Sequence, residues 1–211
     1  MTVGRSSYQV DLLVEGLPCL VVGGGHIGAR KARQLVEAGA RVHVVATVVG
    51  DEIKGLAGTS WDERPYRRGD VEGYWLVMTA TGDPTVDGLV FEEAQQAHIW
   101  VNSADDPEHC TFTLPATLRR GRMQVAVSTG GSSPAFSGWM RDRLDAELGP
   151  EYEPLLDLLA DERESMRRSG RPLVAADWRA ALDSGMLEMI REGRLAEAKE
   201  RLQACLSSSS D

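Results

Sequence analysis

The feature that most constrains this chain is a glycine-rich segment between an apolar run and an amphipathic one. Residues 23–28 read Gly-Gly-Gly-His-Ile-Gly and fit the pattern G-x-G-x-x-G. The apolar residues 20–22 precede this segment, and an amphipathic stretch follows it. In a strand–turn–helix frame, Gly23 permits the tight turn, Gly25 lets the backbone approach a pyrophosphate, and Gly28 lets the helix pack closely on the sheet. We predict a dinucleotide-binding turn; the alternative is a glycine-rich turn that binds no ligand.

Short apolar runs alternate with amphipathic stretches through the first half of the chain, as in βαβ units. The expected strands cover residues 19–23, 41–46, 75–81 and 99–104, and the expected helices cover residues 26–38 and 84–97. Strands that are apolar along their whole length are typical of a parallel sheet covered by helices on both faces. The sequence therefore predicts an α/β fold with a Rossmann-like, doubly wound parallel sheet.

The second half of the chain has a different character. Residues 111–114 and 123–128 are expected to form two more strands, divided by the basic residues 119–122. Ser133 is a suitable N-cap, and Pro134 a suitable first residue, for a helix that continues to residue 148. Beyond residue 150 we expect short helices. The expected parts are a Rossmann domain over residues 1–113, a small α+β segment over 114–149 and a helical C-terminal domain over 150–211.

Charge, cysteine content and hydrophobicity exclude several classes of protein. The 23 Lys and Arg residues are outnumbered by 32 Asp and Glu residues, and the net charge of -9 argues against nucleic acid as a partner. Cys19, Cys110 and Cys205 are far apart and form no CxxC pair, so we expect neither a disulfide framework nor a structural zinc site. The apolar runs are too short to span a membrane, and residues 1–9 carry no apolar secretory core. We therefore expect no membrane partner and a cytoplasmic location.

The end of the second expected strand bears on the choice of coenzyme. Residues 45–48 contain no acidic side chain to bind the ribose 2′-hydroxyl of NAD, and we expect Asp51 to lie too far along the chain for that role. This segment also contains no Arg for the 2′-phosphate of NADP. We therefore favour NAD over NADP, with Thr47 and the neighbouring backbone as hydrogen-bonding groups.

A polar segment follows the last expected strand of the sheet, at the carboxyl edge where doubly wound folds place their chemistry. Asp105 and Asp106 precede Pro107, which is typical of a turn, although a carboxylate beside a cofactor can also act as a general base or bind a cation. His109 and Cys110 are adjacent, so their side chains diverge on an extended chain, and no second His lies at ligand spacing. We expect no metal site here.

Four segments of the chain carry a resemblance to a known family: residues 19–33, residues 79–81, residues 101–107 and residues 125–134. Together they resemble the precorrin-2 dehydrogenase/sirohydrochlorin ferrochelatase proteins of siroheme synthesis. This family includes the N-terminal part of siroheme synthase and stand-alone enzymes. They occur in order across about residues 8–148, whereas the helical tail resembles the family only in position and length.

The resemblance implies a dehydrogenase that transfers hydride from precorrin-2 to NAD⁺ and forms sirohydrochlorin. Many members also insert Fe²⁺, as a substrate, to give siroheme. Asp105 matches the carboxylate that the family uses as acid/base in both steps, and His26, Ile27, Thr47 and Val48 match positions that contact the cofactor. The predicted cofactor-binding residues are Gly23, Gly25, His26, Ile27, Gly28, Thr47, Val48 and Thr81.

The resemblance also implies a homodimer, with residues 114–149 as the dimerisation segment, and a tetrapyrrole substrate. Several basic residues offer partners for the carboxylates of such a substrate, although a solvated surface explains them equally well: Arg119, Arg120, Arg122, Arg141 and Arg143. Thr129 matches a position that is a serine open to phosphorylation in some relatives. Because the sequence ends at Asp211, we expect no methyltransferase domain and a separate protein that supplies precorrin-2.

Two other functions remain open. The first is a regulatory module that senses NAD(H) and switches a partner without catalysis. The second is an ordinary small-molecule dehydrogenase, which would need a larger substrate domain and an evident His or Lys proton donor.

Overall fold

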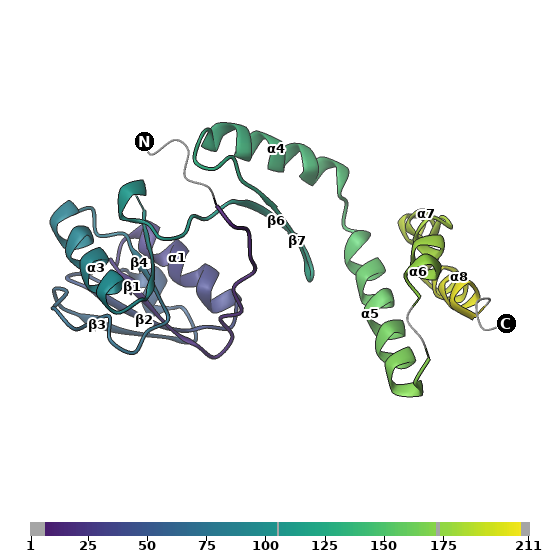
Figure 1. The fold of residues 1–211 in the computed structure, drawn as a ribbon, viewed down its shortest axis with the longest axis horizontal. Helices are drawn as coiled ribbons and strands as arrows, with labels where there is room; N and C mark the ends of the chain where they lie inside the picture. The colour runs from purple at the N-terminus through teal and green to yellow at the C-terminus, as the bar shows by residue number, and fades with distance from the viewer. Residues whose placement is uncertain (1–6, 105, 172–173, 208–211) are drawn as a thin grey trace. The chain divides into compact units, whose positions relative to one another are not determined.

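The computed structural model describes residues 7–104, 106–171 and 174–207. The chain forms two compact units, Met1–Leu114 and Pro115–Asp211, which are described separately below (Figure 1).

The first unit contains a parallel sheet of five strands in the order β3-β2-β1-β4-β5. The strands are β1 (Pro18–Val22), β2 (Arg41–Ala46), β3 (Thr59–Glu63), β4 (Leu76–Thr79) and β5 (Trp100–Ser103). The strand order reverses between β1 and β4, which is the topological switch point where such sheets bind ligands. The predicted Rossmann-like, doubly wound sheet is confirmed.

Each face of this sheet is covered by one long helix, α1 (His26–Glu37) or α3 (Pro84–Gln96). Neighbouring residues of a strand point to opposite faces, so Val21 packs in the core with residues of α1, whereas Leu20 packs in the core with residues of α3. The central strand β1 is therefore buried on both sides, as its continuous apolar sequence predicts. The described part of this unit also contains two short helices, α2 (Asp51–Lys54) and the 3₁₀ helix η1 (Pro107–His109).

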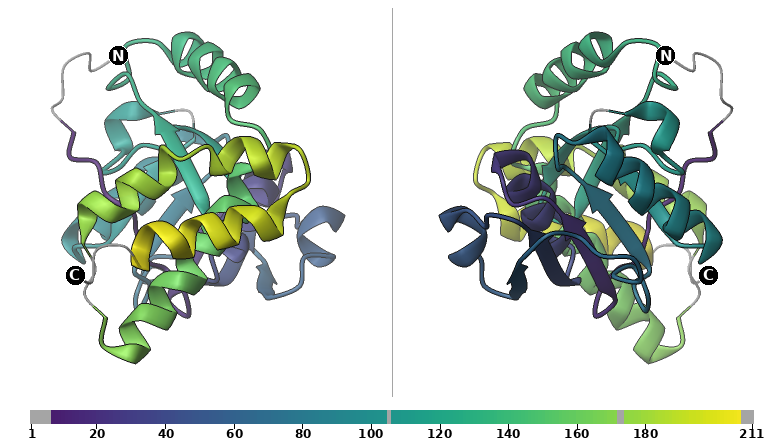
Figure 2. Two further views of the ribbon diagram at one scale, coloured as in Figure 1. Left: turned by 90° about the vertical axis from the view of Figure 1, so that its right-hand side faces the viewer. Right: turned by 90° about the vertical axis from the view of Figure 1, so that its left-hand side faces the viewer.

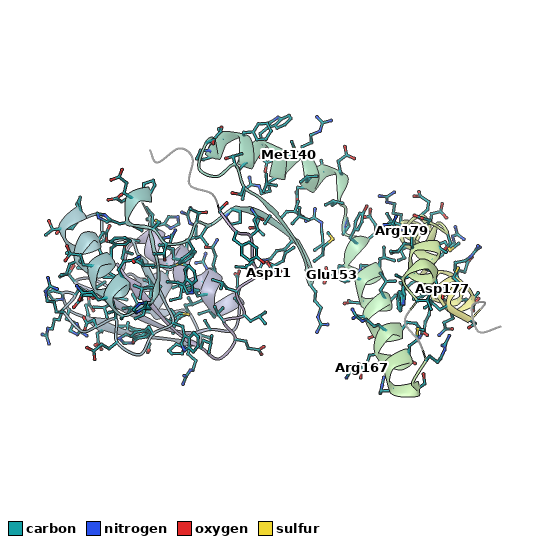
Figure 3. The ribbon with its side chains drawn as sticks, in the orientation of Figure 1. Asp11, Met140, Glu153, Arg167, Asp177 and Arg179 are labelled. Carbon is teal, nitrogen blue, oxygen red and sulfur yellow. The ribbon has the colours of Figure 1, made fainter. Side chains whose placement is uncertain are left out.

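The second unit begins with an antiparallel hairpin of β6 (Ala116–Arg120) and β7 (Met123–Val127), against which α4 (Pro134–Glu147) packs. Gly121 has a φ of 55°, the left-handed conformation that a two-residue hairpin turn requires. A Cβ at Gly121 would lie 2.6 Å from Cγ of Glu153, which is labelled on α5 in Figure 3. Ser133 caps α4 by accepting a hydrogen bond from the Phe136 N–H at 3.2 Å, as predicted.

The prediction of a strand over residues 111–114 is wrong. Thr111 lies beside β5, where its N–H donates to the Val101 carbonyl at 2.8 Å and its Oγ1 accepts from the Val101 N–H at 2.8 Å. The strand that pairs with β7 begins at Ala116 and includes Arg119 and Arg120. Arginine side chains are long enough to leave a strand and reach solvent, so a basic run does not interrupt it.

The described residues after α4 are mainly helical, as predicted, although α5 is a long helix of 18 residues and not a short one (Figure 2, green to yellow). The helices are α5 (Tyr152–Ser169), α6 (Ala175–Leu182), α7 (Met186–Arg191) and α8 (Leu195–Ser207). Leu155, Met186 and Leu202 are buried in their common core. Among the residues that the structure describes, no helix has the length and apolar character needed to cross a membrane.

Candidate dinucleotide-binding site

The loops that follow β1, β2 and β4 meet at the carboxyl edge of the sheet. The Gly23 N–H donates to the Val45 carbonyl at 2.9 Å, and the Gly50 N–H donates to the Gly24 carbonyl at 3.0 Å. A Cβ at Gly23, whose φ is +124°, would lie 2.3 Å from the Ala80 carbonyl oxygen, and a Cβ at Gly24 would lie 2.0 Å from the Val48 carbonyl oxygen. Both positions therefore require glycine, because the backbones of the neighbouring loops approach too closely for any side chain.

The N-terminus of α1 is open at this edge. Gly25 is its N-cap, and within the described part of the chain no side chain caps this helix end. The first helical hydrogen bond runs from the Ala29 N–H to the Gly25 carbonyl at 2.9 Å, so the N–H groups of His26, Ile27 and Gly28 precede the helical hydrogen-bond ladder. These N–H groups and the positive end of the helix dipole favour an anion at this point.

Gly25 and Gly28 differ in their surroundings. A Cβ at Gly28 would lie 2.1 Å from the Gly23 carbonyl oxygen, so the close approach of α1 to the turn depends on glycine. A Cβ at Gly25 would meet no protein atom within 4 Å. The open space beside Gly25 is where a pyrophosphate would approach the backbone, so this cradle fits a dinucleotide.

A cavity of about 290 Å³ adjoins the cradle and is lined by Gly24, Gly25, His26, Ala29, Gly50, Asp51 and Glu52. Asp51 therefore lies beside the glycine turn, although the sequence suggested that it lies too far along the chain. The reason is the short loop after β2, whose Gly50 hydrogen-bonds to Gly24 and so brings the start of α2 to the cradle. Glu52 was not predicted as a site residue, and its only signal in the sequence is its position directly after Asp51.

Glu52 gives one wall of this cavity a negative charge. Its Oε1 lies 3.1 Å from His26 Nδ1, and its Oε2 accepts a hydrogen bond from Arg33 Nη2 at 3.1 Å. Hydrogen bonds with His26 and then Arg33 lower the pKa of the Glu52 carboxyl, so this group is ionised at neutral pH.

The other residues predicted to contact a cofactor lie around the same edge. Thr47 and Val48 are exposed directly after β2, and Ile27 is 37% exposed in the first turn of α1. The Thr81 backbone lies next to Gly23, but the Thr81 hydroxyl donates to Asp87 Oδ1 at 2.7 Å and so connects its loop to α3. The structure therefore brings all eight predicted cofactor-binding residues to one edge of the sheet.

The end of β5 is connected to α1 by a buried polar contact. The Lys31 ammonium donates a hydrogen bond to Asn102 Oδ1 at 2.7 Å, and Asn102 Nδ2 donates to the Phe112 carbonyl at 2.9 Å. Two residues later, the Ala104 N–H donates to the Thr79 carbonyl at 3.0 Å. Asp105, the predicted acid/base, lies outside the described residues.

Asp106 has the turn-forming role that the sequence allowed for this acidic pair. Its carboxylate accepts from the Glu108 N–H at 3.0 Å, which caps η1, and its Oδ2 lies 2.7 Å from His109 Nδ1. Desolvation acts to raise the pKa of Asp106, but the hydrogen bonds from Glu108 and His109 outweigh it and lower this pKa.

His109 packs against Phe91, whereas Cys110 is buried with its Sγ 3.2 Å from the Ser103 nitrogen, so the two side chains diverge. Within the described ranges, no three His, Cys, Asp or Glu side chains form a metal site.

The basic residues of the second unit have different roles. Arg120 is structural, because it donates to the Leu148 carbonyl at 2.8 Å and to Asp145 Oδ1 at 2.8 Å at the end of α4. Arg141 pairs with its neighbour Asp142, and Arg143 lies over the ring of Trp139 at 5.9 Å. Arg119 and Arg122 are exposed.

Thr129 also has structural contacts. Its Oγ1 accepts from the Ser133 N–H at 3.0 Å and lies 3.3 Å from Ser137 Oγ, so it forms part of the turn before α4.

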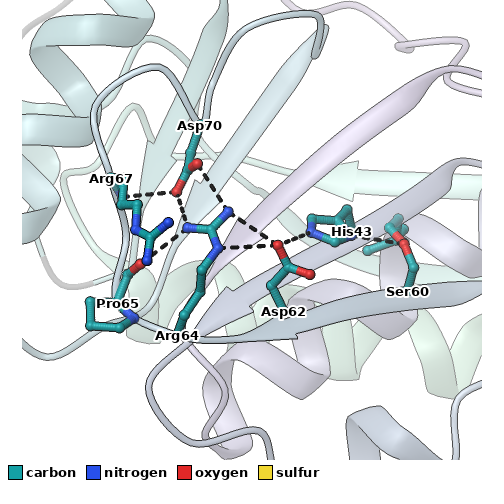
Figure 4. A network of polar contacts seen from close by, with 8 residues as sticks. His43, Ser60, Asp62, Arg64, Pro65, Arg67 and Asp70 are labelled. Carbon is teal, nitrogen blue, oxygen red and sulfur yellow. Dashed lines mark hydrogen bonds and ion pairs between the residues drawn. The ribbon is translucent and has the colours of Figure 1, made fainter.

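A second polar network joins β2, β3 and the loop that follows β3 (Figure 4). Arg64 binds Asp70 through two hydrogen bonds of 2.6 and 3.0 Å and also contacts Asp62, while His43 Nδ1 lies 2.8 Å from Ser60 Oγ. The hollow beside it, about 520 Å³, includes Pro18, Arg41 and Thr59, the first residues of three parallel strands. It is therefore at the amino edge, where α/β sheets do not bind their dinucleotides.

The strand order, the glycine cradle and the open N-terminus of α1 define a Rossmann-type dinucleotide-binding protein. Family comparison agrees, since residues 11–116 match the family described as putative NAD(P)-binding. The chain therefore belongs to this family. Residues 120–147 match the central part of sirohaem biosynthesis proteins, which confirms the resemblance inferred from the sequence.

Individual proteins that are similar in sequence to this chain are also siroheme synthases. The siroheme synthase of Nitrosomonas eutropha is 34% identical over 210 residues, which are 97% of this chain and 44% of that protein. Siroheme synthase 1 of Halorhodospira halophila is 35% identical over 205 residues, which are 92% of this chain and 42% of that protein. The chain thus spans less than half the length of these relatives. The solved structure of SirC, precorrin-2 dehydrogenase, has a TM-score of 0.74 at 23% identity and covers 94% of this chain and 100% of its own, so the two share a fold.

Proposed function

We propose that this protein is an NAD-dependent dehydrogenase that converts precorrin-2 to sirohydrochlorin in siroheme biosynthesis. The observation that carries the proposal is the glycine cradle at the N-terminus of α1, in a chain whose relatives are siroheme synthases. The cradle supports a dinucleotide, and the relatives support the choice of substrate.

The residues around the cradle fit NAD better than NADP. The N–H groups at the start of α1 would bind the pyrophosphate, and the exposed residues Thr47 and Val48 would contact the adenosine half. The ionised Glu52 and its neighbour Asp51 line the adjoining cavity, where their charge would repel the 2′-phosphate of NADP. Bound NAD⁺ would supply the hydride acceptor.

The chain itself would contribute proton transfer and substrate recognition. Oxidation of precorrin-2 to sirohydrochlorin removes one hydride and one proton from the macrocycle, and we assign Asp105 as the base that accepts the proton. Asp105 directly follows Ala104, whose N–H is bonded to the end of β4. Arg119, Arg122 and Arg143 would bind carboxylates of the tetrapyrrole, with residues 114–149 as the dimerisation segment of a homodimer in the cytoplasm. In this proposal residues 1–113 bind the coenzyme and residues 150–211 form the helical domain.

The test is to incubate the purified protein with precorrin-2 and NAD⁺ and to follow NADH formation. We expect Asp105→Ala to lower turnover strongly while it leaves the Kd for NAD⁺ within about twofold, because the cradle is untouched. Asp106→Asn is the matched control, since Asn keeps the capping function of Asp106 and removes the adjacent charge. Full activity of the Asp105 variant, or equal losses in both variants, would refute the role of Asp105.

Insertion of Fe²⁺ into sirohydrochlorin is a second candidate activity, supported by the siroheme synthases among the relatives. Metal insertion removes two pyrrole protons, and the carboxylate of Asp105 can accept them one after the other if it releases the first proton to water before the second transfer. The test mixes the protein with sirohydrochlorin and Fe²⁺; siroheme absorbance that grows no faster than without protein would exclude this activity.

Sensing of NAD(H) without catalysis is the competing function. The precorrin-2 assay separates the two functions, because a sensor would bind NAD⁺ in calorimetry and yet form no NADH.

A further inference from the structure

Lys31 on α1 is buried, with 4% of its surface exposed, and its Nζ lies 2.7 Å from Asn102 Oδ1. In the part of the chain that the structure describes, no other Lys or Arg is buried. An ammonium in a protein interior loses hydration and needs polar partners. The neighbouring buried residues of α1, Ala29, Ala32 and Leu35, are apolar and belong to the core. Packing alone would therefore be served by an apolar side chain, so the cation at this position calls for another explanation.

The contact joins the coenzyme helix to the end of the strand that precedes Asp105. Asn102 is held from two sides, by Lys31 and by the Phe112 carbonyl. The next two residues also form hydrogen bonds. The Ser103 N–H donates to Cys110 Sγ at 3.2 Å, and the Ala104 N–H donates to the Thr79 carbonyl at 3.0 Å. The chain that enters the predicted catalytic loop is thus connected to α1 through Asn102 and to β4 through Ala104.

We propose that Lys31 is a positioning residue for the dehydrogenation, acting through Asn102. Its hydrogen bond holds the carboxyl end of β5 against the helix whose N-terminus forms the coenzyme cradle. A small displacement between a catalytic group and its partner lowers a rate by as much as about 100-fold. Lys31 would prevent that displacement. This inference rests on the proposed function.

Kinetics of Lys31→Met, Lys31→Arg and Asn102→Ala test this role, with precorrin-2 and NAD⁺ as substrates. We expect kcat to fall on the order of 10- to 100-fold in Lys31→Met, and Lys31→Arg to restore part of the loss because it keeps a charged donor. The Kd for NAD⁺ should stay within about twofold, since the N–H groups of the cradle precede Lys31 by about one helical turn. Lys199→Met, which removes an exposed lysine from α8, is the control and should leave kcat unchanged.

Two further readouts separate positioning from a general contribution to folding. If Lys31 acts through Asn102, the double variant Lys31→Met/Asn102→Ala should have the same kcat as the less active of the two single variants. Hydrogen exchange followed by mass spectrometry should show faster exchange of peptides covering residues 101–112 in Lys31→Met, with residues 18–22 of β1 unchanged.

The inference is overturned if Lys31→Met keeps wild-type kcat, if the two single effects add, or if affinity for NAD⁺ falls in parallel with kcat. Should Lys31→Met fail to fold, Lys31→Arg and Asn102→Ala still decide the question through kcat and hydrogen exchange. A wild-type protein that forms no NADH refutes the proposed function and this inference with it, whereas an active wild type with an equally active Lys31→Met refutes the inference alone.

Discussion

Substitution of Gly25 by alanine separates coenzyme binding from folding. The added methyl group would meet no protein atom within 4 Å, and the φ of Gly25, -79°, suits any residue. Alanine is a poorer N-cap than glycine but restricts the unfolded chain, and these opposing effects leave stability nearly unchanged. The methyl group would, however, occupy the space through which a pyrophosphate reaches the start of α1.

The expected loss is the value of one hydrogen bond to a charged group, about 1.5–3 kcal/mol, or roughly 10- to 100-fold in the Kd for NAD⁺. Calorimetric titration with NAD⁺ measures the affinity, and thermal unfolding without coenzyme measures the stability. Gly28→Ala is the matched comparison, because its Cβ would lie 2.1 Å from the Gly23 carbonyl oxygen. That overlap should destabilise the fold by about 1–3 kcal/mol. Wild-type affinity in Gly25→Ala, or an unfolding temperature as low as that of Gly28→Ala, would refute the reasoning.

Other properties of the structure lead to further predictions. Glu52→Gln removes a charge from the wall of the coenzyme cavity, so the preference for NAD over NADP should fall about fivefold in paired calorimetric titrations; an unchanged ratio would show that Glu52 does not face the 2′ position. Burial raises the pKa of the Cys19 thiol to about 11, so at pH 8 the reactive thiolate is scarce and Cys19 should react with a thiol reagent only after unfolding, later than the half-buried Cys205. Equal labelling rates would contradict this. Leu202→Ala in the core of the second unit should lower the free energy of unfolding by about 2–5 kcal/mol in a denaturant titration, and an unchanged midpoint would contradict the assigned packing.

The parallel sheet was predictable because its central strands are apolar along their whole length. β1 and β4 are buried on both faces, and this leaves a continuous signal in the sequence. The edge strand β3 was not predicted, since four of its five residues are exposed and its sequence, Thr-Ser-Trp-Asp-Glu, lacks apolar periodicity. Only its pairing with β2 makes it a strand.

The hairpin shows a different limit of sequence reasoning. Residues 111–114 have the composition of a strand, but Thr111 bonds to β5, and Pro115, which lacks an N–H, directly precedes β6. In β6 the less exposed residues Ala116, Leu118 and Arg120 alternate with the exposed residues Thr117 and Arg119, although the arginines were expected to lie in a loop that divides two strands. Hydrophobic composition predicted that a strand lies near residue 115, but the residues of β6 that pair with β7 are determined by contacts between distant parts of the chain.

The glycine-rich turn of the candidate site was predictable because a single sequence motif specifies its local backbone conformation. The pattern from Gly23 to Gly28 specifies a turn, a helix start and a ligand class together. The acidic wall of Asp51 and Glu52 was not predictable in the same way, because it depends on how the loop after β2 folds back to Gly24. The capping role of Asp106 could not be separated from that of its neighbour in the sequence, because it shows only in the contacts of Asp106 with Glu108 and His109.

The hydrogen bond from the Gly50 N–H to the Gly24 carbonyl joins the loops after β1 and β2 through main-chain atoms, so it does not depend on the side chains that line the coenzyme pocket. Main-chain atoms set the spacing of the two loops before any coenzyme arrives, so association should require little ordering of the backbone. Residues at the start of α2 can therefore be exchanged to retune coenzyme preference while the architecture around them persists, which makes this corner of the fold a natural starting point for engineering.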